Sequence, residues 1–589
     1  MYSNCFNMRR LLFFIILIVQ QGFSQIEFRN DESSLFDQQT VYGTSVLGPS
    51  ISFFDFDNDG WDDITVPASS TRDFRFFKNV EGTFEEINIG ISSDNIQARH
   101  VIWVDFDNDG DNDFFAPSDL GHLWLYRNEG GNTFTDITDT SGLPDVAIPY
   151  WGSSWGDYNN DGILDVFISI RDADQIQGNL LFQGNGDGTF IDITSDAGID
   201  TAGYITFCSS FFDYDNDGDQ DIYTANDKCT TPNTLYRNNG DGTFTDVSIE
   251  SGTNLYMSAM STTVDDFNND GWLDLYVTNF YPPFEEDATV GNAYLINNRD
   301  GTFSNIALEN GTRFDSIGWG AVCLDVTNNT NKDLYVSGSV NGEDGRLSSA
   351  LYLNDGIGNY TITTGTGIED DDFISYSNAI GDIQNDGLQD IVVINASNAP
   401  ISLWNNTTVT DNNWIKIKLE GTTSNRMGIG SRIKVGIGEA VYYGYTLCGE
   451  GYMNQNSSAA FFGLGDATTI DYIEVTWLSG MIDRIEDINP NQTMTILEGS
   501  NPLNTEEFTR HEISVYPNPT TNTIHFIYSG NLQTLDVTII DIHGKVLKKR
   551  RMINTNQEHN IDLSNLGSGI YFLSINDTDK TIVKKIVVL

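Results

Sequence analysis

One stretch decides the fold: Asp55-Phe56-Asp57-Asn58-Asp59-Gly60-Trp61-Asp62-Asp63, whose pattern the chain repeats. Oxygen-bearing side chains stand at positions 1, 3 and 5, glycine at position 6 and a carboxylate at position 9. Seven copies, here called loops 1 to 7, begin at Asp55, Asp105, Asp157, Asp213, Asp266, Asp325 and Asp382, so successive copies are 50 to 59 residues apart. A motif that recurs at this period indicates a repeat architecture.

The residue types in these loops are those that bind calcium. Ca²⁺ prefers six to eight oxygen ligands at about 2.3–2.6 Å, and alternate residues of a tight turn direct their side chains to one centre. The glycine permits the positive φ of the bend, and position 7 adds a backbone carbonyl. Carboxylates this close repel one another unless a cation lies between them. The predicted ligands are Asp55, Asp57, Asp59, Trp61 and Asp63; Asp105, Asp107, Asp109, Asp111 and Asp113; Asp157, Asn159, Asp161, Ile163 and Asp165; Asp213, Asp215, Asp217, Asp219 and Asp221; Asp266, Asn268, Asp270, Trp272 and Asp274; and Asp382, Gln384, Asp386, Leu388 and Asp390.

These loops differ from the EF-hand, which places a bidentate glutamate at position 12. Here that position holds apolar residues or threonine, such as Val66 in loop 1, so we expect a strand–loop–strand site. Loop 6 is degenerate: it lacks the glycine and keeps only two acids, Asp325 and Asp333. We therefore predict about six calcium sites, and for loop 6 a polar turn without metal is the favoured alternative.

The sequence around each loop predicts four short β-strands. One strand leads into the loop, one leaves it, and a third and fourth follow, separated by turns such as Asn239-Gly240-Asp241-Gly242. Alternating apolar residues with such turns are typical of hairpins. Four strands per repeat predict an all-β, seven-bladed propeller, with a linear solenoid as the rival.

The two ends of the repeat region favour the propeller. The last repeat lacks a fourth strand, whereas the segment that starts at Ile26 resembles the fourth-strand segments of the other repeats. We expect this segment to complete the last blade, because closing the ring removes the exposed sheet edges. A solenoid would gain nothing from it.

Residues 26–410 resemble the FG-GAP/VCBS repeats of integrin α-like propellers, which implies calcium in the loops. Residues 411–498 continue with Asn413-Trp414-Ile415-Lys416, Gly451-Tyr452-Met453-Asn454-Gln455-Asn456 and Phe462-Gly463-Leu464-Gly465. This order of motifs resembles the ASPIC/UnbV domain that follows such repeats in the cartilage acidic protein-like family. The resemblance implies a class of protein and no defined reaction. Alternating strands between glycine turns predict a small β-sandwich here.

The C-terminal part follows a polar linker, residues 499–512. Residues 513–589 contain Val515-Tyr516-Pro517-Asn518-Pro519 and Leu566-Gly567-Ser568-Gly569, and strand alternation predicts a second, immunoglobulin-like sandwich. The segment resembles the C-terminal sorting domain of the type IX (Por) secretion system of Bacteroidetes. That resemblance implies passage across the outer membrane with the secretion machinery as a partner; an ordinary adhesive sandwich is the alternative.

The N-terminus predicts export. Residues 1–24 combine Arg9 and Arg10, the apolar run Leu11–Val19 and small residues before a cleavage point, as in secretory signal peptides. The run is too short to span a bilayer, and no other stretch is long and apolar enough. We therefore expect a secreted protein at the cell surface or beyond it, without a membrane span.

Composition excludes several classes of partner. The net charge of −54 argues against binding nucleic acid, whose phosphates require a basic face. It also argues against binding anionic membranes. Cys208 and Cys229 flank loop 4 and are either bridged in an oxidising compartment or buried as free thiols, and no zinc spacing is present.

A search for catalytic groups finds little. The repeats hold two histidines, His100 and His122, without evident partners, and the chain lacks the GxSxG, HExxH and P-loop motifs. Arg426 stands in a glycine-rich turn and either contacts an anion or sugar or pairs with a local acid. Trp151, Trp155 and Trp319 precede loops and pack in the ring or offer a stacking surface.

We therefore predict a secreted, calcium-binding and non-catalytic protein of cell-surface interaction or adhesion. Its partner is an extracellular protein or glycan that the sequence does not identify. The alternative is a calcium-dependent glycan-active enzyme or lectin that uses the propeller.

Overall fold

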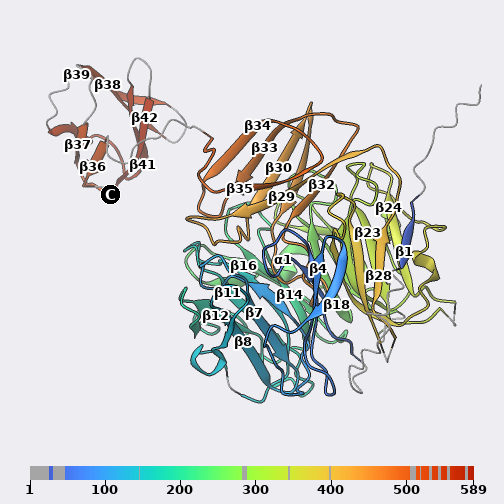
Figure 1. The fold of residues 1–589 in the computed structure, drawn as a ribbon. Coiled ribbons are helices and arrows are strands. Elements are labelled where there is room, and N and C mark those ends of the chain that lie inside the picture. The colour runs from blue at the N-terminus through green and yellow to red at the C-terminus, as the bar shows by residue number, and fades with distance from the viewer. Residues whose placement is uncertain are drawn as a thin grey trace, which may run out of the picture. The chain divides into compact units, whose positions relative to one another are not determined.

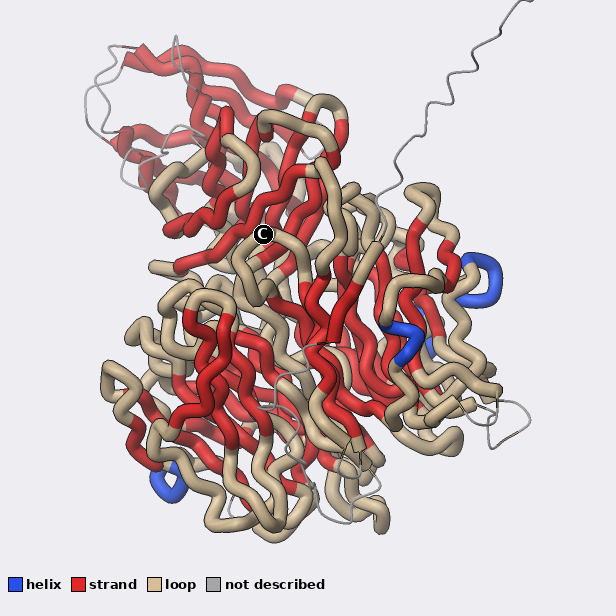
Figure 2. Tube along the Cα trace, turned by 45° about the vertical axis from the view of Figure 1, so that its right-hand side comes forward, coloured by secondary structure: helices blue, strands red, loops and turns tan. Residues whose placement is uncertain are grey.

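The computed structural model describes residues 26–30, 47–144, 146–281, 285, 288–342, 345–396, 399–503, 513–517, 519–528, 534–541, 545–553, 558–576 and 581–589. The chain divides into two compact units, Met1–Pro502 and Leu503–Leu589. The predicted signal peptide, residues 1–24, and residues 504–512 of the predicted linker lie outside the described residues. Strands dominate both units (Figure 2), which confirms the all-β class.

Each repeat of the first unit folds into one four-stranded antiparallel sheet, numbered here by its loop. Within sheets 1 to 6 the strands follow chain order, and the acid-rich loop joins the first strand to the second. Sheets 1 to 3 consist of β2 (Ser52–Phe54), β3 (Asp63–Val66), β4 (Arg75–Val80) and β5 (Thr83–Ile87); β6 (Ile102–Val104), β7 (Asp113–Ser118), β8 (His122–Asn128) and β9 (Phe134–Asp136); and β10 (Tyr150–Gly156), β11 (Asp165–Ile170), β12 (Leu180–Gly184) and β13 (Phe190–Asp192).

Sheets 4 to 7 repeat this plan, and short helical turns connect sheet 2 to sheet 3 and each of sheets 4 to 6 to the next. Their strands are β14 (Thr206–Phe212), β15 (Asp221–Asn226), β16 (Thr234–Asn238) and β17 (Phe244–Asp246); β18 (Ala259–Asp265), β19 (Asp274–Asn279), β20 (Ala293–Asn297) and β21 (Phe303–Asn305); β22 (Gly318–Leu324), β23 (Asp333–Gly338), β24 (Ser349–Asn354) and β25 (Tyr360–Ile362); and β26 (Ser375–Gly381), β27 (Asp390–Asn395), β28 (Ser402–Asn406) and β1 (Phe28–Asn30). The helical turns are η1 (Thr138–Thr140), α1 (Ser248–Ser251), α2 (Ala307–Asn310) and η2 (Ile368–Asp370).

The N-terminal segment closes the last sheet, as predicted. Strand β1 pairs antiparallel with β28, with Phe28 opposite Asn406 (Figure 1). The first strands of successive sheets contact one another from β10 through β14, β18, β22 and β26 to β2. Hydrogen bonds connect the remaining neighbours. Val101 N–H donates to Ser50 Oγ between sheets 2 and 1, and Ser153 N–H donates to His100 Nδ1 between sheets 3 and 2, both at 3.1 Å. The sheets therefore form a closed ring, which excludes the linear solenoid.

The core of the ring lies between neighbouring sheets and around the axis. The indole of Trp103 stacks on Phe56 with ring centroids 4.9 Å apart, which joins sheets 1 and 2. The three tryptophans that precede loops, Trp151, Trp155 and Trp319, are 3%, 0% and 4% exposed. They pack in the ring and offer no surface for stacking a sugar.

The cysteines of the described chain are free thiols. Cys208 Sγ lies 3.4 Å from the Met260 carbonyl, and Cys229 Sγ lies 3.7 Å from Ser258 Oγ. In the structure Cys208 and Cys229 are therefore buried free thiols and not a disulfide bridge.

Residues 413–497 form a β-sandwich within the first unit. Its sheets have the orders β32-β29-β35 and β31-β30-β33-β34, and Ile415, Ile433 and Trp477 lie in the core between them. The unit continues to Pro502, because the Asp483 carboxylate accepts N–H bonds from Gly499 and Asn501 at 2.7 Å. The strands are β29 (Asn413–Glu420), β30 (Arg432–Ile437), β31 (Ala440–Tyr445), β32 (Ala460–Gly465), β33 (Ile470–Thr476), β34 (Ile482–Ile488) and β35 (Gln492–Leu497).

The second unit is a separate β-sandwich. Its sheets have the orders β36-β37-β40 and β39-β38-β41-β42, around a core that includes Phe526, Ile539 and Leu573. The strands are β36 (Ile513–Tyr516), β37 (Thr523–Tyr528), β38 (Thr534–Asp541), β39 (Val546–Ile553), β40 (Glu558–Asp562), β41 (Gly569–Asn576) and β42 (Thr581–Val588). Among the residues that the structure describes, none belongs to a helix with the length and apolarity that crossing a bilayer requires.

Candidate metal-binding loops and the domain that covers them

A fixed set of hydrogen bonds shapes each loop. In loop 1 the Asp55 carboxylate accepts the N–H groups of Asp59 at 3.0 Å and Gly60 at 2.9 Å. The Asp63 carboxylate accepts the N–H of Phe56 at 3.2 Å and that of Asn79, on the third strand, at 2.7 Å. The pair of bonds to position 1 recurs in the loops that begin at Asp105, Asp157, Asp266, Asp325 and Asp382. These bonds hold the position-1 and position-9 carboxylates against the backbone of the loop.

Several carboxylate oxygens inside the loops lack a protein partner. Three carboxylates lie within 4.8 Å of one another in each of loops 1, 2 and 4, namely those at positions 1, 3 and 9. A buried anion without a partner is costly, so a cation is the fitting occupant. The buried oxygens without a hydrogen bond among the described residues include Asp57 Oδ1, Asp107 Oδ1, Asp213 Oδ1, Asp215 Oδ1 and Asp274 Oδ2.

Burial makes these acids prefer the neutral form when no cation is bound. It raises the pKa of Asp63 and of Asp113 to about 9, and the neighbouring loop carboxylates add to the rise. Burial likewise raises the pKa of Asp105 and Asp157 to about 7. A divalent ion would keep such acids ionised by replacing the lost hydration with direct ligation. The same cause raises the pKa of the remaining position-9 acids, Asp165, Asp221, Asp274, Asp333 and Asp390, well above the ordinary value.

Loop 6 keeps the backbone shape and is covered by protein. Thr330 stands where the other loops have glycine and takes a φ of 78°, which is strained for a β-branched residue. Asp325 is 9% exposed, and Gly465 N–H donates to the Asn328 carbonyl at 2.9 Å. A side chain at Gly463 would collide with Asp325 Oδ2, 2.0 Å from the added Cβ. Strand β32 therefore packs directly against loop 6.

An asparagine at position 4 links six of the seven loops to the next, a role that the sequence did not reveal; Asn269 of loop 5 instead accepts the N–H of Tyr443 on β31. In the other six loops the side-chain N–H of this asparagine donates to the carbonyl of the position-6 residue in the following loop, at 2.7 Å between Asn108 and Gly162. The signal was present, because all seven copies have asparagine there. The six bonds run from Asn58 to Gly110, Asn108 to Gly162, Asn160 to Gly218, Asn216 to Gly271, Asn328 to Gly387 and Asn385 to Gly60.

Position 8 supplies a second link between neighbouring loops. Gln220 of loop 4 accepts the Asp157 N–H of loop 3 at 2.7 Å. Asp62 of loop 1 accepts the Asp382 N–H of loop 7 at 3.0 Å, which joins the last copy to the first. A shift in one loop therefore strains its neighbours, so that the loops are mechanically coupled around the ring.

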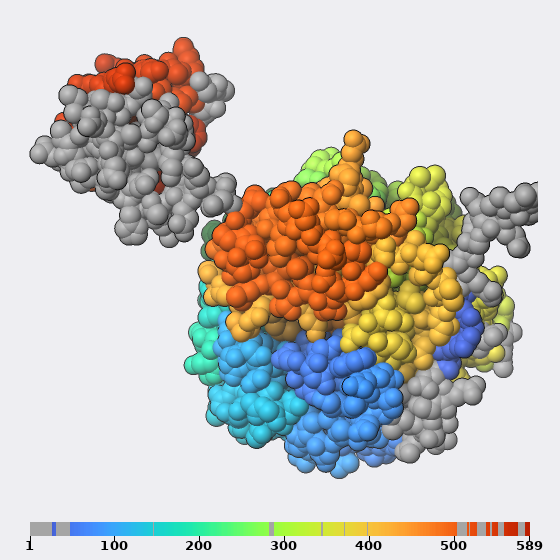
Figure 3. Space-filling view, turned by 45° about the horizontal axis from the view of Figure 1, so that its top comes forward, coloured from blue at the N-terminus to red at the C-terminus, as the bar shows by residue number. Residues whose placement is uncertain are grey.

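Residues 413–502, here called the cap, lie over the loops (Figures 1 and 3). Lys418 Nζ contacts Asp55 Oδ2 at 2.8 Å, and Lys416 Nζ contacts Asp382 Oδ2 at 2.9 Å. Arg432 contacts Asp213 Oδ2 at 3.0 Å. Three cap cations thus bind the position-1 carboxylates of loops 1, 7 and 4. The two lysines alternate along β29, which places both on one face of the strand.

A segment of the cap fills the axis of the ring. Residues 448–457, here called the plug, contain the Gly451–Asn456 motif. The Cys448 carbonyl accepts the Trp155 N–H at 2.8 Å, and the Gln455 carbonyl accepts the Phe53 N–H at 2.8 Å. Tyr452 is fully buried and packs edge-on against Trp319, with ring centroids 4.8 Å apart. The axis is therefore packed with protein.

The turn that contains Arg426 is structural. Arg426 pairs with Glu420 at 2.5 Å, and its own N–H donates to Asn108 Oδ1 at 2.8 Å. Glu498 accepts hydrogen bonds from the Ser479 hydroxyl and from the N–H groups of residues 422–424, and together these lower the pKa of its carboxyl to about 2 against the effect of burial. Of the two alternatives for Arg426, contact with an anion or sugar and pairing with a local acid, the structure shows the second.

Both histidines of the ring pack against neighbouring side chains. His100 is fully buried beside Ser153, and burial lowers its pKa to about 3, so it stays neutral. His122 packs against Trp124 with ring centroids 4.4 Å apart.

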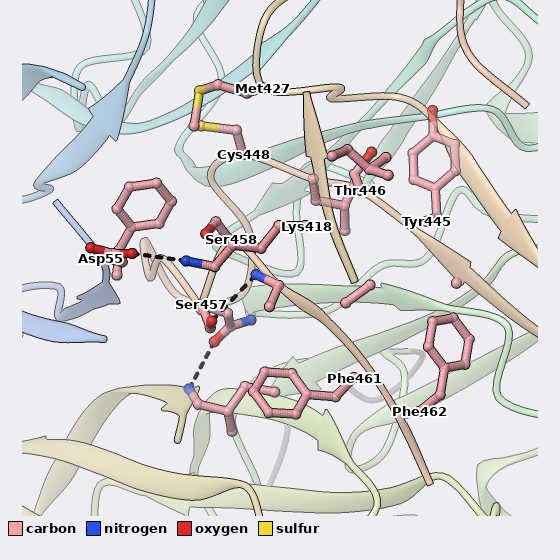
Figure 4. Close-up of a pocket in the computed structure, with 18 of the residues that line it drawn as sticks. Asp55, Lys418, Met427, Tyr445, Thr446, Cys448, Ser457, Ser458, Phe461 and Phe462 are labelled. Atoms are coloured by element: carbon pink, nitrogen blue, oxygen red, sulfur yellow. Dashed lines mark hydrogen bonds and ion pairs between the residues drawn. The ribbon is translucent and has the colours of Figure 1, made fainter. Parts of the chain in front are cut away.

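A cavity of about 890 Å³ separates part of the cap from the loops (Figure 4). Tyr443, Phe461 and Phe462 supply aromatic surface, whereas Ser457 and Ser458 supply hydroxyls. The charged Lys418 side chain points across it to Asp55 (Figure 4). The cavity has room for a small polar ligand with an apolar face.

Comparison with known proteins assigns the parts of the chain. The FG-GAP-like repeat matches residues 55–116, 105–168 and 213–277. The family described as ASPIC and UnbV matches residues 421–503, and the secretion system C-terminal sorting domain matches residues 514–589. Cartilage acidic protein 1 of Xenopus tropicalis is 24% identical over 287 residues, which cover 45% of this chain and 41% of that protein.

Among solved structures the similarity is slight. Cobalt-substituted ACO of Synechocystis has 7% identity and a TM-score of 0.29 over 50% of this chain and 65% of that chain. The extracellular domain of a putative one component system of B. thetaiotaomicron has 11% identity and a TM-score of 0.23 over 96% of this chain and 98% of that chain.

The sorting domain indicates secretion through the type IX system to the extracellular space or the outer-membrane surface. Repeats of the FG-GAP type indicate a protein of surface interactions. The chain thus combines FG-GAP-like repeats, an ASPIC and UnbV domain and a secretion system C-terminal sorting domain, and it is weakly homologous to cartilage acidic protein 1.

Proposed function

We propose that this protein is a calcium-loaded, non-catalytic interaction protein of the cell surface. The observation that carries the proposal is the ring of linked loops whose buried carboxylate oxygens lack protein partners. Calcium bound there would brace the first and second strands of each sheet, since the ligands come from the turn between them. When bound, the ion supplies positive charge and ligation at the loops, and the chain's own residues supply the contact surface.

The absence of catalysis is supported by how the ring is filled. The blades of a propeller surround a central channel, but here the plug residues 448–457 occupy the axis. The loop acids serve the metal, and a metal-bound carboxylate is too weak a base and too strong an acid for general acid–base work.

The surface that we assign to partners lies at the end of the ring opposite the loops. Connections between second and third strands, and those between sheets, lie at that end, because the strands alternate in direction. Leu120, Val146 and Ile176 occur in three such connections and are 63%, 53% and 70% exposed. A methyl group on Gly121 would lie 2.5 Å from Ala147 Cα, so the first two connections are in contact. Clustered exposed aliphatic side chains favour protein–protein contact.

A triple variant tests this surface. We expect Leu120→Ser, Val146→Ser and Ile176→Ser together to reduce binding of the purified protein to outer-surface extract at least about tenfold, because each buried aliphatic contact contributes about 1 kcal/mol or more. Val80→Ser with Ile357→Ser, at the loop end of the ring, is the matched control. Biolayer interferometry with calcium present measures both. Equal binding by the triple variant and the wild type would place the partner elsewhere.

A second candidate function is glycan binding in the cavity, favoured by its aromatic and hydroxyl lining. A glycan array with and without chelator distinguishes it from protein binding. Calcium-dependent retention of one glycan class, lost in Tyr443→Ala, would support a lectin over the main proposal.

A further inference from the structure

The six loops with an intact motif fall into two groups by the residue at position 3. Loops 1, 2 and 4 have a carboxylate there, and loops 3, 5 and 7 have a neutral amide. The residues are Asp57, Asp107 and Asp215 in the first group and Asn159, Asn268 and Gln384 in the second.

A residue on the third strand of each sheet varies with position 3. It directly precedes the residue whose N–H binds the position-9 carboxylate, so its place in the loop geometry is the same in every sheet. It is basic in the first group and neutral in the second, without exception among the six loops. The residues are Lys78, Arg127 and Arg237 in the first group and Gln183, Ile296 and Asn405 in the second.

Contacts show that the two positions face each other. Lys78 Nζ pairs with Asp57 and contacts Asp59 Oδ2 at 2.9 Å. In loop 7 the neutral counterparts meet in the same way, because Gln384 Nε2 donates to Asn405 Oδ1 at 3.2 Å. In loops 1 and 7 the two positions thus meet, whether their residues are charged or neutral.

In loop 2 the corresponding base, Arg127, pairs with Glu129 on the same strand end at 2.6 Å. The direct contact between the base and the position-3 carboxylate is that of loop 1.

In loop 1 the base leaves one oxygen of the position-3 carboxylate for a metal, and the same oxygen is unpaired in the described structure of loops 2 and 4. Asp57 Oδ1, Asp107 Oδ1 and Asp215 Oδ1 are buried without a hydrogen bond in the described structure. In loop 1 it is the other oxygen, Oδ2, that Lys78 contacts. The Asp57 side chain is 7% exposed, so this ion pair is shielded from solvent more than a surface pair would be.

The charges at these two positions balance. A carboxylate with a base in the first group, and two neutral residues in the second, both sum to zero. The calcium affinity of such loops depends on the number of charged ligands. We propose that Lys78, Arg127 and Arg237 set the calcium affinity of loops 1, 2 and 4 by offsetting the additional carboxylate at position 3. The inference rests on the proposed calcium binding.

Loop 1 offers a direct test, because Trp61 at position 7 can sensitise Tb³⁺ luminescence while only its backbone is an expected ligand. The signal of loop 1 is the difference between each protein and its Trp61→Phe counterpart, and calcium competition gives the affinity. We expect Lys78→Gln to raise the calcium affinity of loop 1 about three- to tenfold, and Asp57→Asn to lower it by a similar factor. The double variant should return to within about twofold of the wild type.

Controls separate this inference from its premise. Lys434→Gln removes a lysine that pairs with Glu474 at 2.9 Å in the cap, and it should leave loop 1 unchanged. Gln183→Lys should lower the affinity of loop 3, measured by calorimetry. A wild type that binds neither Tb³⁺ nor calcium defeats the proposed function itself. The inference alone is overturned if the wild type binds calcium but Lys78→Gln has the same calcium affinity in loop 1. The double variant would then have the affinity of Asp57→Asn.

Discussion

Removing calcium should lower the melting temperature of the first unit by about 10 °C or more, the largest stability effect that we expect. A site at ten times its Kd stabilises the native state by about 1.4 kcal/mol, and six sites act on one ring. The links through Asn58 and its counterparts make the contributions non-additive, since neighbouring loops share strain. Differential scanning calorimetry with calcium and with chelator, at equal ionic strength, measures the shift.

Single-loop variants refine this result. Asp215→Ala should lower the melting temperature in calcium, but in chelator the loss should shrink or reverse, because the variant removes a buried carboxylate whose Oδ1 has no hydrogen-bond donor among the described residues. Asp325→Asn in loop 6 is the control, since strand β32 covers that loop and we expect no ion there. Identical melting curves of the wild type with and without chelator would contradict structural calcium.

Deleting residues 513–589 should abolish export and leave the protein in the periplasm. The deleted residues form a separate compact unit and match the secretion system C-terminal sorting domain, so their loss should not unfold the ring. Immunoblots of periplasmic, outer-membrane and medium fractions measure the distribution. Protease resistance of the retained protein would check its fold.

Fusion of the same residues to a periplasmic reporter is the reciprocal control. The reporter should appear at the cell surface or in the medium only in cells with a working type IX system. Normal export of the truncated protein would refute the assignment of the sorting domain.

Local chemistry explains what the sequence could predict. The period of the acid-rich loops and the turns of the Asn239-Gly240 type specify four strands per repeat, because both act within a few residues. The pairing of β1 with β28 was also predictable, since only one sheet lacked a fourth strand.

The features that the sequence did not reveal depend on distant residues. Lys418 and Asp55 are 363 positions apart, and no pattern along the chain relates them. The Gly451–Asn456 motif marks its family, but its role required the axis of the ring to be known. The asparagine at position 4 could be predicted in part. It recurs in every loop, but the sequence does not show that its partner lies on the next sheet.

The central claim is that these loops hold divalent ions that brace a closed ring of sheets. Its most direct test is elemental analysis of the folded protein, purified with calcium present and freed of unbound ions by gel filtration. The account predicts about six calcium ions per chain, one for each loop with an intact motif. A folded, monodisperse protein with almost no bound calcium would contradict it.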